Sequence, residues 1–237
     1  ALPPAAFDDL IEQVKGLDGN DQLSGGGGND TIDGGEGNDD IRGGAGHNRL
    51  IGGEGNDRIW ADGGNDIINA GEGNDTVNAG AGHNTITLGE GNDVSVSLGG
   101  NDTISAGEGN DRVRSGGGND RLLGHEGDDV LLAEAGNDFL SGGEGNDVLN
   151  GGTGNDTLIG GEGSDRFVFN GGTDRIRDFE NGDDEIDLSS FAGFNSFASI
   201  RAAASQSGSD VIIKAGAHRL VIEDTRLNQL DGDDFIW

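Results

Sequence analysis

The chain has 237 residues, with 45 acidic residues against 14 basic ones and a formal net charge of −31. This excess of negative charge excludes function classes that depend on attraction to phosphate groups, so nucleic acids and anionic membranes are not expected as partners. The 49 glycines follow no three-residue period, there is no cysteine, and no apolar run is long enough to span a membrane. The composition instead favours cations as ligands.

Residues 1–15 differ from everything that follows them. Ala-Leu-Pro-Pro-Ala indicates a linker, and Phe7, Leu10, Ile11 and Val14 fall on one face of a short predicted helix. We expect this helix to cap the open strand edge of the next region, and packing against a partner is the alternative. The linker is also compatible with a domain upstream of this chain.

A nine-residue period begins at Gly16 and runs without a break to Arg177. It comprises eighteen units, from Gly16–Ser24 to Phe169–Arg177, with the consensus Gly-Gly-x-Gly-Asn-Asp-x-U-x, where U is apolar. Every unit has glycine in its fourth place, and sixteen have aspartate in the sixth. Such a register indicates a repeat architecture.

Each unit predicts a turn followed by a short strand. The first six residues are expected to form the turn, because glycine permits positive φ and close backbone approach. The last three, such as Thr31-Ile32-Asp33, are expected to form a strand with its middle side chain pointing inward. Two units then make one flattened coil of a parallel solenoid, and each strand stacks on the strand eighteen residues away.

The third place of the unit shows that the true period is eighteen. Units of the first series, counted alternately from Gly16–Ser24, carry Asp18 and then glutamates from Glu36 to Glu162 in this place, whereas the second series carries Gly, Ala or Thr. The two edges of the solenoid should therefore differ chemically. A solvated face that tunes cation affinity, an additional set of ligands and a binding surface are all open interpretations of the glutamate column.

The stacked aspartates predict a bound cation. Strands lie about 4.8 Å apart, and two like charges at this distance repel by about 1 kcal/mol in water, or roughly 3.5 kcal/mol at an effective dielectric of 20. A divalent ion between successive turns would remove this repulsion. Carboxylates and turn carbonyls are hard oxygen ligands in a flexible arrangement, which suits calcium better than octahedral magnesium, and folding would then be coupled to binding.

The repeated nonapeptide resembles the RTX repeat of proteins that are exported by type I secretion. Over residues 16–177, the resemblance implies an all-β, right-handed parallel β-roll with 18 residues per coil and about nine coils, which binds several Ca²⁺ ions. In that family, turn aspartates and backbone carbonyls from two loops on the same edge share each ion. Carried over, the metal ligands are Asp21, Asp30, Asp39, Asp57, Asp66, Asp75, Asp93, Asp102, Asp111, Asp120, Asp129, Asp138, Asp147, Asp156, Asp165 and Asp174.

Two second-series units depart from this pattern. Asn48 and Asn84 take the place of the aspartate, and each follows a histidine, His47 or His83. Asparagine keeps a carbonyl oxygen but loses the charge, so we expect the sites at these turns to be weaker or empty. The two histidines are two coils apart, roughly 10 Å by strand spacing, which is too far for one shared ion.

Residues 178–237 are predicted to form a small β-rich cap. A helix is expected around Phe197–Ala204, followed by a hairpin of Val211–Lys214 and Arg219–Glu223. The acidic residues before the terminal Phe235-Ile236-Trp237 are similar to the uncleaved export signal of RTX proteins. A folding cap alone explains residues 178–230 equally well.

These features favour a secreted, monomeric calcium-binding module that folds outside the cell and has the type I secretion machinery as a partner during export. No catalytic motif is present, so no enzymatic activity is expected of this chain. One alternative is the C-terminal part of a secreted protease, lipase or alginate epimerase-like enzyme. Another is an adhesin or polymer-binding solenoid, which would need a regular outward ladder that the varied strand residues do not supply.

Overall fold

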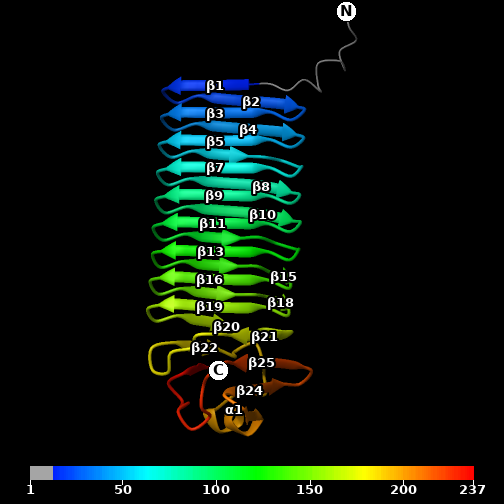
Figure 1. Cartoon of the computed structure of the whole chain (residues 1–237), viewed down its shortest axis with the longest axis vertical. Coiled ribbons are helices and arrows are strands. Elements are labelled where there is room, and N and C mark those ends of the chain that lie inside the picture. The colour runs from blue at the N-terminus through cyan, green and yellow to red at the C-terminus, as the bar shows by residue number, and fades with distance from the viewer. Residues whose placement is uncertain (1–12) are drawn as a thin grey trace, which may run out of the picture.

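Two parallel sheets form the two faces of a tall, flat coil (Figure 1). The computed structural model describes residues 13–237. The first sheet stacks β1 (Gln13–Asp18), β3 (Thr31–Glu36), β5 (Arg49–Glu54), β7 (Ile67–Glu72), β9 (Thr85–Glu90), β11 (Thr103–Glu108), β13 (Arg121–Glu126), β16 (Phe139–Glu144), β19 (Thr157–Glu162) and β21 (Thr173–Ile176). The second stacks β2 (Gln22–Gly27), β4 (Asp40–Ala45), β6 (Arg58–Trp60), β8 (Thr76–Ala81), β10 (Val94–Gly99), β12 (Arg112–Arg114), β14 (Val130–Leu132), β17 (Val148–Asn150), β20 (Arg166–Val168) and β22 (Glu185–Asp187).

The eighteen-residue register predicted from the third place of the unit is confirmed. Strand β3 pairs in parallel with β5 through Ile32↔Leu50, Gly35↔Gly53 and Glu36↔Glu54. The chain alternates between the sheets, so each nonapeptide supplies one strand and one turn. First-series turns, such as Gly37-Asn38-Asp39, lead from the first sheet to the second, and second-series turns lead back.

The strands are longer than the three residues predicted. In the first sheet, β3 runs through Thr31-Ile32-Asp33 into the next unit as far as Glu36, so the turn shrinks to three residues. Glycine has a low strand propensity, which is why the sequence pattern places the start of each unit in the turn. In the second sheet, two further short strands, β15 (Ala135–Gly136) and β18 (Thr153–Gly154), pair separately.

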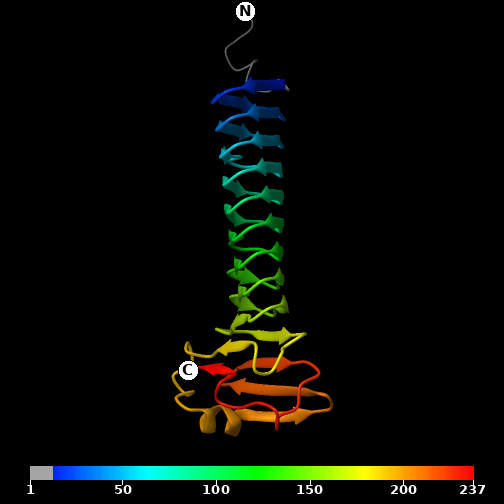
Figure 2. The same cartoon turned by 90° about the vertical axis from the view of Figure 1, so that its left-hand side faces the viewer.

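The eighth place of each unit builds the core between the sheets. Ile32, Ile41, Leu50 and Ile59 are completely buried, and the later eighth-place residues up to Ile176 are at most 1% exposed, whereas Leu23 in the first unit is only partly buried. Ser95, which replaces the apolar residue in one unit, also points inward and is 1% exposed. The narrow edge-on profile in Figure 2 shows the two sheets face to face, and these buried side chains lie between them.

The sheets of the roll extend beyond the predicted repeats at both ends. Val14 lies in β1 and pairs with Ile32, so the helix predicted for residues up to Lys15 is wrong from Gln13 onward; Phe7, Leu10 and Ile11 lie outside the described residues. At the other end, β22 continues the second sheet. The nine coils expected between residues 16 and 177 thus gain strands on both sides.

The C-terminal segment closes the end of the roll. Strand β25 (His218–Ile222) pairs in parallel with β21 and antiparallel with β24 (Asp210–Ala215), which pairs with β23 (Ala204–Ser207). The predicted hairpin is therefore confirmed, as is the helix, α1 (Phe197–Ala203). Strand β26 (Phe235–Ile236) extends the second sheet by pairing with β22. Within Gln13–Trp237, no helix has the length and apolar character needed to cross a membrane.

Candidate metal centre

The sixth-place aspartates line the inside of the two edges of the roll. From Asp30 to Asp174 their exposed fractions are 1–3%, and Asp21 in the first turn is half-buried. The structure brings the predicted ligands together as two columns, one for each series of turns. Carboxylates that are this deeply buried need charge compensation or protonation.

Two hydrogen-bond ladders of opposite direction join successive turns. In the sixth place, Oδ1 of Asp57 accepts the backbone N–H of Asp39 in the preceding turn, at 2.7 Å. In the fifth place, Oδ1 of Asn38 accepts the backbone N–H of Asn56 in the following turn, at 2.6 Å. Each turn is thus fixed to both of its neighbours, and one carboxylate oxygen of each ladder aspartate is already in use.

The second carboxylate oxygen is buried without a hydrogen-bond partner in most of these aspartates. This holds for Oδ2 of Asp21, Asp39, Asp57, Asp66, Asp75, Asp93, Asp111, Asp120, Asp129, Asp138, Asp147, Asp156 and Asp165. Asp102 differs, because its Oδ2 accepts the hydroxyl of Ser97 at 2.6 Å. A buried, unpartnered anionic oxygen costs several kcal/mol in an ordinary protein interior, so its repetition indicates a missing positive partner.

Backbone carbonyls face the space between coils beside these aspartates. A Cβ placed on Gly35, whose φ is +109°, would collide with the carbonyl oxygen of Leu17 in the preceding coil, and one on Gly37, at φ +119°, with that of Gly19. The same collision recurs at the equivalent glycines along both edges. Glycine in the second and fourth places therefore leaves room for carbonyl oxygens that point along the roll axis.

Burial raises the pKa of twelve of the column aspartates. The pKa reaches about 7 at Asp75, Asp111, Asp129 and Asp138, about 6 at Asp57, Asp147 and Asp165, and about 8 at Asp174. At Asp75 burial is the largest cause; the N–H of Asp57 lowers the pKa, and the charges of Asp93 and Asp57 raise it again. A cation nearby would act in the opposite direction and favour the ionised form.

The donor set fits calcium better than a metal that prefers side-chain nitrogen or sulfur. Within residues 13–237, no three His, Cys, Asp or Glu side chains converge into a metal-binding group. Between two turns, the oxygens on offer are backbone carbonyls and the unpartnered aspartate oxygens. An all-oxygen set that combines carboxylates with backbone carbonyls is typical of calcium.

The Asn48 and Asn84 turns keep the ladder while changing the charge. Oδ1 of Asn48 accepts the N–H of Asp30 at 3.0 Å, and its amide donates to the carbonyl of Gly44. The neighbouring histidines also fit the ladder, because Nδ1 of His47 accepts the N–H of Asn65 at 2.8 Å. His83 does the same for Asn101, so both histidines replace asparagine as turn acceptors.

Asp184 also belongs to the first-series column, although the nine-residue pattern does not predict it. Its Oδ1 accepts the N–H of Asp165 at 2.9 Å, and burial raises its pKa to about 6. One inserted residue places it nineteen positions after Asp165, which breaks the nine-residue count. The signal that could have found it is Ile186, an apolar residue two places after the acid, as in the repeats.

The glutamate column lies at the ends of the strands of the first sheet, beside the first-series turns. Its side chains, from Glu36 to Glu162, are exposed, while their backbone carbonyls accept N–H groups of the preceding turns, as Glu36 does from Gly19 at 2.7 Å. The exposure favours the solvated-face interpretation over an additional set of ligands.

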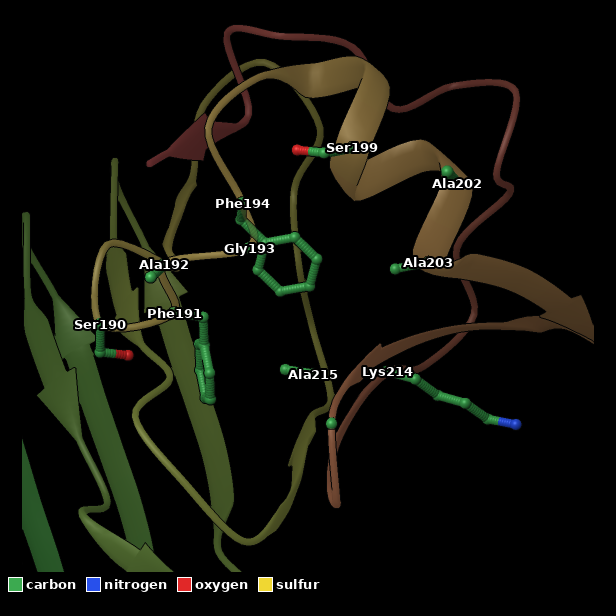
Figure 3. Close-up of a pocket in the computed structure, with 11 residues that line it drawn as sticks. Ser190, Phe191, Ala192, Gly193, Phe194, Ser199, Ala202, Ala203, Lys214 and Ala215 are labelled. Carbon is green, nitrogen blue, oxygen red and sulfur yellow. The ribbon is translucent and has the colours of Figure 1, made fainter.

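A cavity of about 600 Å³ lies in the cap, away from both columns. It is lined by Phe191, Phe194, Ala203 and Ala215, and the Lys214 side chain extends away from the two rings (Figure 3). Its lining is mainly apolar and includes no metal-ligating carboxylate.

Comparison with known proteins identifies one sequence family. The RTX calcium-binding nonapeptide repeat profile matches the chain in overlapping segments that run from residue 8 to residue 176. A comparison with curated proteins finds no match.

Among solved structures, the chain is similar to a Ca²⁺-dependent β-helical antifreeze protein from an Antarctic bacterium, at 30% identity and a TM-score of 0.47, over 73% of this chain and 57% of that one. For extracellular lipase LipA from Serratia marcescens the identity is 20% and the TM-score 0.34, over 89% and 40% of the two chains. For a subunit of the Azotobacter vinelandii mannuronan C5-epimerase the values are 26% and 0.37, over 59% and 80%. The chain thus spans less than two thirds of the lipase and of the antifreeze protein.

Proposed function

The chain belongs to the family of RTX calcium-binding nonapeptide repeats, and on this premise we propose that Ca²⁺ ions bind between successive turns and fold the roll outside the cell. The observation that carries the proposal is the column of buried Oδ2 atoms without hydrogen-bond partners, from Asp39 to Asp165. At each of these turns, backbone carbonyls of the preceding coil face a glycine of the following coil.

The sixth-place aspartates, with the carbonyls of the second and fourth places, would hold the ions. A bound Ca²⁺ supplies the positive charge that these acidic turns lack. Without it, the aspartates must either take up protons, as their raised pKa values indicate, or repel one another. Because the unfolded chain offers no such arrangement of carbonyls, the binding free energy becomes folding free energy.

We assign the folded state to the extracellular space. Extracellular calcium modules bind with dissociation constants near 10⁻⁴–10⁻³ M, so such a roll is unfolded where calcium is scarce and folded where it is millimolar. The absence of cysteine is compatible with a fold that is stabilised by metal instead of disulfides. We further propose that residues 16–177 are the repeat region of a monomer, and that residues 178–237 serve as its cap and as the signal read by a type I exporter.

Circular dichroism during a calcium titration tests the proposal. In excess chelator we expect the spectrum of an unfolded chain, and a cooperative gain of β signal as free Ca²⁺ rises to millimolar levels. Mg²⁺ at equal ionic strength is the control and should not restore the signal, because it accepts fewer carbonyl ligands. A fully folded spectrum in chelator contradicts the proposal.

A further inference from the structure

The second-series turns that end in Asn84 and Asp102 are joined differently from their neighbours. Both residues are buried, with exposed fractions of 2%, and Oδ1 of Asp102 accepts the N–H of Asn84 at 2.7 Å, as in every other turn pair. The difference lies in the remaining polar atoms, the Nδ2 group of Asn84 and Oδ2 of Asp102.

The orientation of the Asn84 amide is fixed by its neighbour in the preceding coil. The N–H of Asp66 donates to Oδ1 of Asn84 at 3.0 Å, which only an oxygen can accept. The Nδ2 group therefore points the other way, where it donates to the carbonyl of Gly82 in its own turn at 3.3 Å and to the hydroxyl of Ser97 in the next coil at 3.4 Å. The fourth-place carbonyl of this turn, a candidate calcium ligand in other turns, already has a donor.

Ser97 completes the chain of hydrogen bonds. It occupies the first place of its unit, where consensus units have glycine, and its hydroxyl donates to Oδ2 of Asp102 at 2.6 Å. At a first-place glycine, an added Cβ would collide with the aspartate oxygen of the same turn; on Gly52 it would meet Oδ2 of Asp57. Serine puts a hydroxyl donor at this point.

The backbone around Ser97 adapts to this arrangement. Strand β10 pairs with β8 in regular register up to Val96↔Asn78, and then shifts at Ser97↔Gly80 and again at Gly99↔Ala81. A shift of this kind is a β-bulge, which re-aims side chains at the edge of a sheet. Leu98 is left 66% exposed by the bulge, while the Ser97 side chain points inward with an exposed fraction of 1%.

The next second-series unit provides an internal comparison. Ser115 also occupies the first place and is completely buried, but its hydroxyl donates to the carbonyl of Ala133 at 3.3 Å. Oδ2 of Asp120 in the same turn is left without a partner. A serine in the first place is therefore not sufficient; the combination of Asn84, the bulge and Ser97 satisfies Asp102.

We propose that the Asn84–Asp102 turn pair is closed by hydrogen bonds in place of a calcium ion, so that this joint of the roll binds no metal and forms without it. The inference rests on the proposed function, because it treats this pair as an exception within calcium-bound columns. The Asn84 amide and the Ser97 hydroxyl already direct their partial positive charge at the Gly82 carbonyl and at Oδ2 of Asp102, so a Ca²⁺ ion at these oxygens would have to displace or repel both donors. The Asn48–Asp66 turn pair is not closed in this way. Ala61, which has no hydroxyl, occupies the first place of the next second-series unit, and Oδ2 of Asp66 has no partner.

A crystal structure of the full chain grown in excess Ca²⁺ tests the inference on the wild-type protein. Anomalous scattering should place ions between successive first-series turns and none between the turns of Asn84 and Asp102. An ion bound between these two turns overturns the inference. Ions absent from every turn pair would overturn the proposed function, and the inference with it.

Restoring the consensus gives a second, independent measurement. The double variant Asn84→Asp, Ser97→Gly should bind one more Ca²⁺ ion than the wild type when native mass spectrometry counts ions at saturation. Ser115→Gly is the matched control and should leave the number unchanged. An equal number of ions in the folded double variant and the wild type overturns the inference; if the double variant does not fold, the wild-type crystal structure decides.

Discussion

The first-series and second-series turns share the same backbone geometry and differ in the side chains that they carry. Both use the same pair of ladders, and both hold aspartates that are buried inside the edge. The first series has an unbroken aspartate column beside an exposed glutamate column, whereas the second series contains Asn48, Asn84 and Ser97 and has no such glutamates. The backbone geometry therefore does not require the charge; the ladder needs an acceptor oxygen, and only ion binding needs the second carboxylate oxygen.

The largest expected effect is that of pH on the metal-free roll, because it acts on both series at once. Asp75 and Asp111 of the first series and Asp138 of the second have pKa values of about 7 in the folded chain against 3.8 ordinarily, so the folded state binds more protons between these limits. Stability is then highest near pH 4 and is lost as pH rises to about 7. For each aspartate with a raised pKa, the loss of folding free energy is about 1.4 kcal/mol for every tenfold difference in proton affinity between the folded and the unfolded chain.

Circular dichroism of metal-free protein should therefore show more β structure at pH 5 than at pH 7.5. The calcium-loaded protein should behave in the opposite way, and its folding midpoint should move to higher Ca²⁺ at pH 5.5, because protons compete for the same oxygens. A metal-free spectrum that loses β signal on acidification would refute the interpretation of the raised pKa values.

Asp111→Asn should convert a first-series turn into one like that of Asn48. The amide oxygen can still accept the N–H of Asp93, so the ladder survives while one charge is lost. We expect the calcium midpoint for folding to rise about tenfold, which corresponds to about 1.4 kcal/mol. Isothermal titration calorimetry would measure the affinity; an unchanged midpoint and ion number would show that the Asp111 charge is not used.

The reverse change, Asn48→Asp with Asn84→Asp, should make the second series resemble the first. We expect additional or tighter ions and a folding midpoint several-fold lower in Ca²⁺, measured by ion counting and by calcium titration. Asn92→Asp with Asn110→Asp, two changes in the exposed fifth place, adds the same two charges outside the column and controls for net charge. If the double variant binds as the wild type does, the two asparagines do not limit binding.

The smallest effect is expected in the outer ladder. Oδ1 of Asn92 accepts the N–H of Asn110 at 2.7 Å in an exposed position, so Asn92→Ala should cost about 0.5–1.5 kcal/mol without loss of an ion. Urea unfolding in saturating calcium would measure this. Asp128 naturally serves as such an acceptor for Asn146, so Asn92→Asp should be close to neutral in the same experiment.

Most of this architecture could be predicted from the eighteen-residue period, because side chains repeated at that spacing can stack in only one register. The inward place of Ile32 and the burial of Asp39 and Asp57 follow from it. The extra strand at Val14 was missed because its unit has no glycine, and Asp184 because one insertion shifts the count. The donor role of Ser97 could not be predicted, since it depends on the bulge in β10 and on the direction of the Asn84 amide.

The opposite directions of the two ladders bear on how long such a roll can be. Since each coil donates to the coil before it through one column and to the coil after it through the other, excising one whole coil brings equivalent donors and acceptors back together. Excising a single nonapeptide would instead place first-series turns, with their glutamates, at the edge that second-series turns occupy. The fold therefore tolerates growth or shortening in steps of eighteen residues, with the cap as a fixed terminus.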